Sequence, residues 1–564
     1  MRLALLVSGS KAMLESLKRE KVKVIFGIPG GAIMPFYDVL YGDPDIRHIL
    51  MRHEQGAAHA ADGYARASGG VGVCLATSGP GATNLVTGIA TAQMDSSPVV
   101  SIAGQVPTAM IGTDAFQEAD VFSLMLPITK HNYLIRKAEQ VPRVVKMAFE
   151  IAVAGRPGPV HVDIPRDVQL EEAEVIYPSG RILDFKDPSA GASSLAKAIK
   201  MIAEAERPVI FAGGGIITSG ACSEVLMLAE LLGAPVVTTL LGKGVVPETH
   251  PICLGMIGMH GSRITNRAVI ECDLMLAVGV RFDDRATGNV QSFAPKARII
   301  HIDIDASEIG KNVRVDLPIV AGVKETLTSI YKNLAASQEK LKKTVWGERI
   351  NQLRRELPEE DLNQSQGGSV VTPPLIVRTV MKVLGEDDIV TTEVGQCQMW
   401  TAQYLKVRRP RTLITSGGLG TMGFGFPAAI GAKVAKPSSV VVDMAGDGSF
   451  LMNCNQLATA VEEDIPVVVV VFNNRYLGMV RQWQELFFGK RYSATYLGET
   501  PNFVKLAEAF GGQGWFVERA SELEPALREA VKCGKPAVID VQIPKEYNVF
   551  PIIPPGRGLQ DMVG

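Results

Sequence analysis

The chain has little of several features that would place it in a specialised class of proteins. Its seven cysteines among 564 residues are odd in number and scattered, with no close pair of the kind found in zinc or redox motifs. No apolar run approaches the roughly 20 residues of a membrane-spanning helix. Lysine plus arginine, at 57, nearly balances aspartate plus glutamate, at 59, without a basic block. A disulfide scaffold is excluded, and nothing favours nucleic acid or a membrane as a partner.

The beginning of the chain does not match a secretion signal. The apolar stretch Leu3 to Val7 is too short for a signal-peptide core, and an amphipathic helix is predicted directly after it, from Lys11 to Lys18. We therefore expect a cytoplasmic protein with reduced, buried cysteines.

Strand-like apolar runs alternate with helical patterns along most of the chain. This predicts an α/β fold whose mainly parallel sheets carry helices on both faces. The phrase Ala-Thr-Ala, five residues, Pro-Val-Val occurs at 90–100 and again at 458–468, with a looser form at 231–237. The repetition suggests three related, doubly wound domains, although Pro-Val-Val is also ordinary chemistry for the start of a strand.

Two segments without a sustained period divide these units. Residues 171–195 mix Pro, Gly, Ser and charge, and are predicted to be a linker. Residues 336–372 begin with a charged helix over 339–357 and continue as a polar run over 363–368. The resulting domains are 1–180, 190–335 and 370–564.

The most specific pattern runs from Gly446 to Asn474. Gly446-Asp447-Gly448 follows the predicted strand Val440 to Ala445 and precedes a helix near Ser449, so that backbone N–H groups can face a diphosphate. Asn474 lies 27 positions after Asp447, at the end of the strand Val467 to Phe472. The Asp447 carboxylate, the Asn474 amide oxygen and the backbone carbonyl of Tyr476 suit Mg²⁺. A bare Gly-Asp-Gly is usually an ordinary turn, but the whole arrangement resembles the thiamine diphosphate signature.

A glutamate near the N-terminus has the position of a cofactor-activating acid. The strand Ile46 to Met51 leads to Glu54 and then to a helix of small residues, Gly56 to Arg66. A carboxylate there is ordinary for a helix N-terminus. In thiamine diphosphate enzymes, a glutamate hydrogen-bonded to the pyrimidine drives its imino form, and such a carboxylate works best with a raised pKa.

Further motifs extend over essentially the full length, and with them the chain resembles the catalytic large subunits of the acetohydroxyacid synthase (acetolactate synthase) family. The matching segments are 26–32, 52–55, 78–84, 112–118, 281–285, 417–423 and 479–483. The segments 281–285 and 481–483 are the most particular to this family. The resemblance implies an N-terminal pyrimidine-binding domain, a central FAD-binding domain and a C-terminal diphosphate-binding domain.

The resemblance also implies residue roles. The residues expected to contact thiamine diphosphate are Glu54, Ser78, Gln396, Cys397, Gly420, Met422, Gly446, Gly448 and Ser449. Met422 matches the side chain over which the cofactor bends. Cys397 stands where the family commonly has His, and because a thiol is a poor donor to phosphate, it contributes only its backbone N–H or leaves the contact to others.

The implied reaction is decarboxylation of pyruvate and ligation of the hydroxyethyl unit to pyruvate or 2-ketobutyrate, in the biosynthesis of valine, leucine and isoleucine. The expected catalytic residues are Glu54, Gln117, Arg281, Met422 and Trp483, and the expected substrate residues are Gly31, Ala32, Phe116, Gln117, Arg166, Arg281 and Trp483. Trp483 would pack the extra methyl group of the acceptor while Arg281 pairs with its carboxylate. Arg166 replaces the usual Lys, which leaves its role open.

FAD is the third expected cofactor, with a structural role because the reaction has no net redox change. The positions that match flavin contacts are Arg156, Gly213, Gly214, Gly215, Met259, His260, Gly279, Arg281, Asp284, Arg285, Asp303 and Ile304. Glycines after the strand Val209 to Ala212, and an acidic residue after the strand Arg298 to Ile302, suit such a ligand. Gly213 to Gly215 is not a true dinucleotide fingerprint.

Three alternatives accompany this hypothesis. A pyruvate oxidase would pass electrons from the same intermediate to FAD, a glyoxylate carboligase would lack the glutamate seen here as Glu54, and a silent cofactor-binding protein would not turn over. The family further implies a homodimer or a dimer of dimers, with each active site shared between two copies, and a separate small regulatory subunit.

Overall fold

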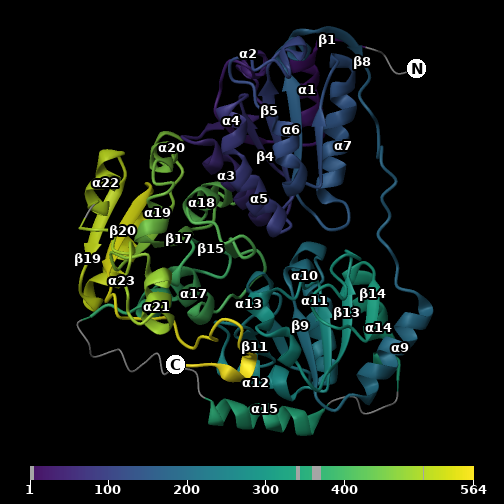
Figure 1. Cartoon of the computed structure of the whole chain (residues 1–564), viewed down its shortest axis with the longest axis vertical. Coiled ribbons are helices and arrows are strands. Elements are labelled where there is room, and N and C mark those ends of the chain that lie inside the picture. The colour runs from purple at the N-terminus through teal and green to yellow at the C-terminus, as the bar shows by residue number, and fades with distance from the viewer. Residues whose placement is uncertain (1–4, 338–342, 358–369, 500) are drawn as a thin grey trace.

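The computed structural model describes residues 5–337, 343–357, 370–499 and 501–564. Within them, three six-stranded sheets, each packed between helices, form three units that meet at the centre of the molecule (Figure 1). The predicted α/β class with three mainly parallel, helix-covered sheets is confirmed. No described helix has the length and apolar character needed to cross a membrane.

The N-terminal sheet has the strand order β3-β2-β4-β5-β7-β6, with every neighbouring pair parallel. Helices α1, α2 and α7 share a hydrophobic core with one face, while α3 and α5 cover the other. The strands are β2 Val24–Gly27, β3 Arg47–Leu50, β4 Gly72–Ala76, β5 Val99–Gln105, β6 His131–Leu134 and β7 Val160–Pro165, and the helices are α1 Gly9–Arg19, α2 Met34–Leu40, α3 Glu54–Ser68, α4 Pro80–Asn84, α5 Val86–Met94, α6 Val121–Met125, α7 Val141–Val153 and α8 Arg166–Leu170.

The C-terminal sheet repeats this topology in the order β16-β15-β17-β18-β20-β19. When the six strands of each sheet are numbered as they occur along the chain, the neighbours across both sheets are the second, first, third, fourth, sixth and fifth strands. The strands are β15 Ile389–Thr392, β16 Leu413–Thr415, β17 Val441–Gly446, β18 Val468–Asn473, β19 Gln513–Val517 and β20 Ala537–Gln542, and the helices are α16 Pro373–Val383, α17 Gln396–Tyr404, α18 Gly425–Ala435, α19 Asp447–Phe450, α20 Gln456–Glu462, α21 Gly478–Phe487, α22 Phe503–Ala509 and α23 Ala520–Lys532.

The repeated phrase in the sequence marks equivalent positions of these two sheets. At 90–100 it covers the end of α5 and the start of β5, and at 458–468 it covers α20 and the start of β18. Both strands are fourth in their sheet, so the close repeat reflects a shared topology. The looser form at 231–237 covers the start of the second strand of the middle sheet, not the fourth, so it reflects only the chemistry of a strand start.

The middle sheet has a different order, β11-β10-β9-β12-β13-β14, so successive strands are added on one side of β9 up to β11 and on its other side from β12 onward. The strands are β9 Pro208–Ala212, β10 Val236–Thr238, β11 Cys253–Met256, β12 Leu274–Val278, β13 Arg298–Asp303 and β14 Leu317–Val320, and the helices are α9 Ala192–Glu204, α10 Gly214–Ser219, α11 Cys222–Leu232, α12 Arg263–Glu271, α13 Asp284–Thr287, α14 Val323–Ala336 and α15 Thr344–Glu356.

The predicted linker 171–195 is partly wrong. It contains β8, Glu172–Val175, which pairs antiparallel with β1, Leu5–Ser8, and its last residues begin α9. The pairing joins segments far apart in sequence, which local composition does not report. The helix predicted over Lys11 to Lys18 is confirmed by α1, and that over 339–357 by α15, as far as it is described. Leu3, residues 338–342 and the polar run 363–368 lie outside the described residues.

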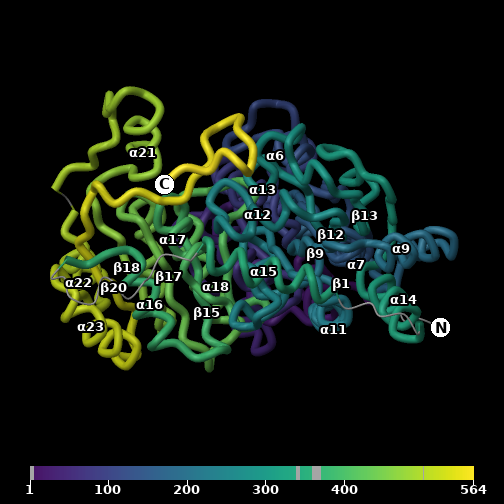
Figure 2. Tube along the Cα trace, turned by 90° about the horizontal axis from the view of Figure 1, so that it is seen from below, coloured from purple at the N-terminus to yellow at the C-terminus, as the bar shows by residue number. Residues whose placement is uncertain are grey.

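The N- and C-terminal units pack through α3 and α18. A methyl group at Gly63 would lie 2.1 Å from the carbonyl oxygen of Ala428, and one at Gly431 would lie 1.9 Å from that of Ala60, so the two helices touch along their backbones. After β20 the chain crosses to the middle unit (Figure 2), where Ile552, Ile553 and Leu559 are buried in its core.

Candidate active site

The strongest site candidate lies at the carboxyl ends of β15, β17 and β18, beside the point where the C-terminal strand order reverses. Asp447 begins α19, Gln396 begins α17 and Asn474 follows β18. The Asn474 side-chain amide donates to Gln396 Oε1 at 3.1 Å, and Gln396 donates to Gln482 Oε1 at 3.0 Å. Asp447 accepts the N–H groups of Gly448 at 2.8 Å and Arg475 at 2.6 Å. The structure thus brings Asp447, Asn474 and Gln396 together.

The surroundings of Asp447 fit a metal-bound diphosphate. The Asp447 carboxylate is buried and poorly solvated, and this raises its pKa to about 7. A bound cation would compensate for the lost solvation of the charged form. A Cβ at Gly395 would meet nothing within 4 Å, and one at Gly420 only Val394 at 3.9 Å, so open space lies in front of these turns. Tyr476 N–H donates to Asn474 Oδ1 at 3.1 Å, which ties the Tyr476 backbone to this loop.

The described residues contain no group of three histidine, cysteine, aspartate or glutamate side chains able to hold a metal ion. A metal at Asp447 therefore depends on amide, carbonyl and phosphate oxygens, which is the ligand set that Mg²⁺ prefers.

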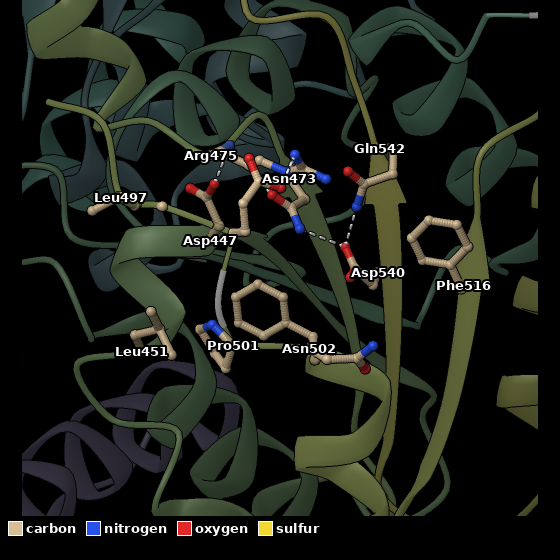
Figure 3. A pocket seen from close by; sticks show the side chains of 13 residues that line it. Asp447, Leu451, Asn473, Arg475, Leu497, Pro501, Asn502, Phe516, Asp540 and Gln542 are labelled. Carbon is tan, nitrogen blue, oxygen red and sulfur yellow. Dashed lines mark hydrogen bonds and ion pairs between the residues drawn. The ribbon is translucent and has the colours of Figure 1, made fainter.

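A small cavity of about 110 Å³ borders Asp447 on the side of β20 (Figure 3). Asp540 lines it, and the side-chain amides of Asn473 and Gln542 each donate to Asp540 Oδ1 at 2.8 Å. Asn473 is therefore committed to Asp540, which leaves its neighbour Asn474 as the amide that faces Gln396.

The turn from Ser416 to Gly423 carries Gly420 and Met422. Gly420 and Gly423 have φ of +70° and +85°, a region that favours glycine. Glu393, whose side chain is fully buried, accepts the Gly423 N–H at 2.7 Å and the Ser449 hydroxyl at 2.6 Å. Sequence reasoning missed Glu393, although its place at the end of a strand and just before Gly395-Gln396 was a usable signal.

Cys397 is buried behind this site. Burial raises the pKa of its thiol well above the ordinary value, with nearby carboxyl groups acting in the same direction, so the thiol stays protonated. A Cβ at Gly446 would lie 3.5 Å from its sulfur. Cys397 lies in the first turn of α17, which agrees with a contribution through its backbone N–H.

Glu54 belongs to a second cluster, at the carboxyl edge of the N-terminal sheet. It begins α3, is 8% exposed and accepts the Asn84 side-chain amide at 3.0 Å. A Cβ at Gly81 would lie 3.3 Å from Glu54 Oε1, and one at Gly79 would lie 2.7 Å from the Gln117 carbonyl oxygen. The structure therefore brings the turn after Ser78 and the Gln117 backbone to Glu54. Asn84 was missed as a partner.

The remaining substrate candidates lie along the same edge. Ala32 N–H donates to Thr77 Oγ1 at 3.2 Å, and a Cβ at Gly31 would meet nothing within 4 Å. Arg166 is exposed at the end of β7, and the Phe116 side chain is 88% exposed. Within the described residues, no hydrogen bond or ion pair links Glu54 with Asp447, Asn474 or Gln396.

In the middle unit, the glycine loops meet at the reversal between β9 and β12. A Cβ at Gly213 would lie 1.9 Å from the Gly279 carbonyl oxygen, and one at Gly215 would lie 2.8 Å from the Gly279 Cα. Gly214, between them, faces Leu241. At the end of β13, burial raises the pKa of Asp303 to about 6. This reversal point, with an acidic residue on a neighbouring strand, fits a dinucleotide.

Other predicted flavin contacts surround that point. Arg156, from the N-terminal unit, donates to Asp305 at 3.2 Å and to Glu308 at 2.6 Å, next to the half-buried Ile304. Met259 N–H donates to the Arg285 carbonyl at 2.8 Å, and the Met259 carbonyl accepts the Ile553 N–H of the C-terminal tail at 3.0 Å. The neighbouring His260 is buried, and Asp284 has a largely exposed side chain.

Trp483 lies beside Arg285. The Arg285 guanidinium carbon is 5.9 Å from the centre of the Trp483 ring, whereas Arg281 Nη2 lies 3.0 Å from the place of a Cβ at Gly418. Within the described residues, no hydrogen bond or cation–π contact joins Arg281 to Trp483, and their predicted roles, each on the acceptor substrate, stay predictions. Arg285, predicted only as a flavin contact, is the guanidinium next to the indole.

Comparison with known proteins covers almost the whole chain. Three family models of the thiamine pyrophosphate enzymes match it: the N-terminal TPP binding domain at residues 7–124, the central domain at 195–330 and the C-terminal TPP binding domain at 393–541. A probable acetolactate synthase large subunit of Methanocaldococcus jannaschii is 53% identical, over 99% of this chain and 95% of that protein.

Two more distant relatives agree with this. A probable acetolactate synthase large subunit of Methanococcus aeolicus is 49% identical, over 99% of this chain and 95% of its own length, and an acetolactate synthase of Mycobacterium bovis is 46% identical, over 98% and 90%. None of these relatives bears the name of a pyruvate oxidase. The chain therefore belongs to the acetolactate synthase large subunits within the thiamine pyrophosphate enzymes.

Proposed function

We propose that this chain is the catalytic subunit of an acetolactate synthase that decarboxylates pyruvate and joins the resulting two-carbon unit to pyruvate or 2-ketobutyrate. The products would be 2-acetolactate and 2-aceto-2-hydroxybutyrate. The observation that carries this proposal within the fold is the grouping of Asp447, Asn474 and Gln396 at the reversal point of the C-terminal sheet. The family relationship supplies the reaction class.

Mg²⁺ and FAD are proposed beside thiamine diphosphate. Asp447, Asn474 and the Tyr476 carbonyl would hold Mg²⁺, and the cation would offset the cost of burying the Asp447 carboxylate. FAD would lie where Gly213 to Gly215 approach Gly279, with Asp303 towards a hydroxyl group of the ligand. The domain limits 1–180, 190–335 and 370–564 are part of the same proposal.

When bound, thiamine diphosphate would supply a nucleophilic carbon for the ketone of pyruvate and a cationic ring able to take up the electron pair released on decarboxylation. Glu54 would exchange a proton with the pyrimidine nitrogen. Its burial restricts water, and the Asn84 amide fixes the orientation of its carboxyl group. Met422, half-buried between two left-handed glycines, would support the bend of the cofactor.

The substrate pocket is proposed to lie between Trp483 and the exposed edge of the N-terminal unit. The Trp483 indole would pack the extra methyl group of 2-ketobutyrate, and an arginine would pair with the carboxylate. Arg285 is favoured for this pairing because it lies next to the indole. Gly31, Ala32, Gln117 and Arg166 would line the opposite wall.

A homodimer, or a dimer of dimers, is proposed to complete the site. Glu54 of one copy would face the Asp447 cluster of the other, and the exposed Phe116 would be covered in that assembly. A small regulatory subunit is the further partner that membership among large subunits suggests.

The proposal is tested by supplying the purified protein with pyruvate, with and without 2-ketobutyrate, in the presence of thiamine diphosphate, Mg²⁺ and FAD. Acetolactate alone, and then a mixture with acetohydroxybutyrate, are the expected products. Omission of Mg²⁺ or of FAD, one at a time, tests each cofactor. Electron transfer to a dye in step with pyruvate consumption, without either ligation product, would overturn the proposal.

A further inference from the structure

The turn Ser416–Gly423 is the meeting point of all three units. Glu393 holds its end from the C-terminal unit. Leu241, from the middle unit, lies 3.0 Å from the place of a Cβ at Gly417. The third contact comes from the N-terminal unit, at the end of α5, through Thr91 and Asp95. None of the predicted roles includes either of these two residues.

Asp95 binds two consecutive N–H groups of this turn. Its side chain is fully buried; Oδ2 accepts the Gly417 N–H at 3.0 Å, and Oδ1 accepts the Gly418 N–H at 2.6 Å. Arg66 donates to the same carboxylate at 2.9 Å, so the two side chains form an ion pair behind the turn. Hydrogen bonds to an ionised, desolvated acceptor are stronger than neutral ones, so Asp95 restrains both peptides of the turn.

The approach of Asp95 explains the glycine at position 418. A Cβ at Gly418 would lie 2.8 Å from Asp95 Oδ1 and 3.0 Å from Arg281 Nη2. One helical turn before Asp95, the Thr91 hydroxyl is 2.7 Å from the Thr421 hydroxyl, directly before Met422. Helix α5 therefore holds the turn near both ends, and Gly420 lies between the two contacts.

We infer that Asp95 is a positioning residue for the reaction, which sets Gly420 and Met422 against the cofactor from the N-terminal unit of the same chain. The inference rests on the proposed function. Asp95 acts through the turn, whereas Glu54 is proposed to act on the cofactor of the other copy. The N-terminal unit would thus contribute to two active sites. Glu54 would act on the cofactor in one of them, and Asp95 would position the turn in the other.

The chain offers a matched control in Asp62. Its side chain is also fully buried and pairs with the same Arg66, at 2.7 Å and 2.9 Å. The hydrogen bonds of its carboxylate within the described residues run to Arg66 and not to the turn. Asp62→Asn and Asp95→Asn therefore remove equivalent carboxylates, but only Asp95→Asn loosens Gly417 and Gly418.

The experiment measures binding of thiamine diphosphate with Mg²⁺ to the full-length protein by quenching of tryptophan fluorescence, beside steady-state kinetics on pyruvate. We expect Asp95→Asn to raise the half-saturating concentration of thiamine diphosphate about tenfold and to lower kcat, with the KM for pyruvate unchanged within about twofold. Asp62→Asn is expected to lower the Tm but to keep wild-type half-saturation. A purely structural lesion would reduce the active fraction and leave half-saturation unchanged.

Wild-type half-saturation in Asp95→Asn, or an equal rise in both variants, would overturn the inference. If Asp95→Asn does not fold, Thr91→Val takes its place. This variant keeps the shape of the side chain and removes the contact with Thr421, and unchanged half-saturation in it would also overturn the inference. Wild-type protein that binds no thiamine diphosphate would instead overturn the proposed function, so the two failures are distinguishable.

Discussion

At the residue scale, Glu54 has the most specific expected effect. Glu54→Gln keeps the shape of the side chain and can still accept the Asn84 amide, but it cannot exchange a proton. Loss of general acid–base catalysis is worth about 10²–10⁴-fold, and we expect kcat to fall in this range with the Tm unchanged. Turnover of pyruvate is the measurement. Normal turnover would show that Glu54 is not the activating acid.

The two arginines near the substrate region give a second prediction at this scale. Arg285→Gln is expected to raise the KM for 2-ketobutyrate about tenfold or more, because the guanidinium that it removes lies next to Trp483. Arg281→Gln is the matched control, with an effect below about threefold. Competition between pyruvate and 2-ketobutyrate, followed by product analysis, separates the two. A larger effect of Arg281→Gln than of Arg285→Gln on this KM would support the role predicted from sequence for Arg281.

At the scale of elements, the contact of α3 with α18 predicts a strong difference between two glycines in helices. Gly431→Ala would place a methyl group 1.9 Å from the Ala60 carbonyl oxygen, and such overpacking costs about 1–3 kcal/mol of unfolding free energy. Gly347→Ala, in α15, meets nothing within 4 Å and is expected to stabilise by about 0.5–1 kcal/mol. Denaturant unfolding checks both, and equal effects would contradict the backbone contact.

The docking of α15 predicts a pH dependence. Arg349 binds both carboxylate oxygens of Glu271 on α12, at 2.9 Å and 2.8 Å, and this pairing, with a smaller contribution from Arg267, lowers the pKa of Glu271 from 4.5 to about 2. Because the folded-state pKa lies below the unfolded value, the stabilisation is fully present above pH 4.5 and is lost as the pH falls towards 2.

Arg349→Gln is therefore expected to lower the Tm by about 2–4 °C at pH 7 and by less at pH 3. Thermal unfolding followed by circular dichroism at both pH values measures this, with Arg355→Gln, at an exposed position of the same helix, as the control. An equal loss of Tm at pH 3 and pH 7 would mean that the Glu271 charge is not responsible.

Local periodicity was sufficient to predict the buried strands that were named from the sequence. The strands Val209 to Ala212 and Arg298 to Ile302 were predicted to within a residue, because buried parallel strands are continuous apolar runs. The pairing of β1 with β8 was missed, because these are two four-residue segments, β8 with two glutamates, that lie more than 150 residues apart and become strands only through each other. The shared order of the outer sheets was visible only as a repeated phrase.

At the scale of the whole molecule, the proposed sharing of active sites predicts complementation. Glu54→Gln and Asp447→Asn should each abolish most activity alone. In a mixed dimer, one site carries both lesions and the other carries neither, so equal mixing with free exchange should restore about a quarter of wild-type activity. Refolding or slow exchange of the mixed variants, followed by a turnover assay, is the test. No recovery would place both residues in one site of one chain.

The site was only partly predictable for a reason at this scale. Asp447 and Asn474 were predicted because each follows a strand whose end is readable in the sequence, whereas Gln396 was predicted from the family resemblance. Asn84 and Asp95 were missed, because a buried carboxyl or amide group becomes significant only when the turn or side chain it binds is known. Glu393 was missed although it follows a readable strand end. Arg281 and Arg285 are only four positions apart in the chain. The three-dimensional structure was needed to show that Arg285 lies next to Trp483 and that Arg281 lies next to Gly418.

The contact between α3 and α18 also determines where movement is permitted. Two helices that touch through glycine and alanine backbones cannot slide past each other without a collision of main-chain atoms, so we expect the N- and C-terminal units of one chain to move as a single body. Entry of substrate must therefore depend on segments outside this contact. The loop at 112–118, with its exposed Phe116, and the tail after β20 are where ligand-dependent protection from hydrogen exchange should concentrate.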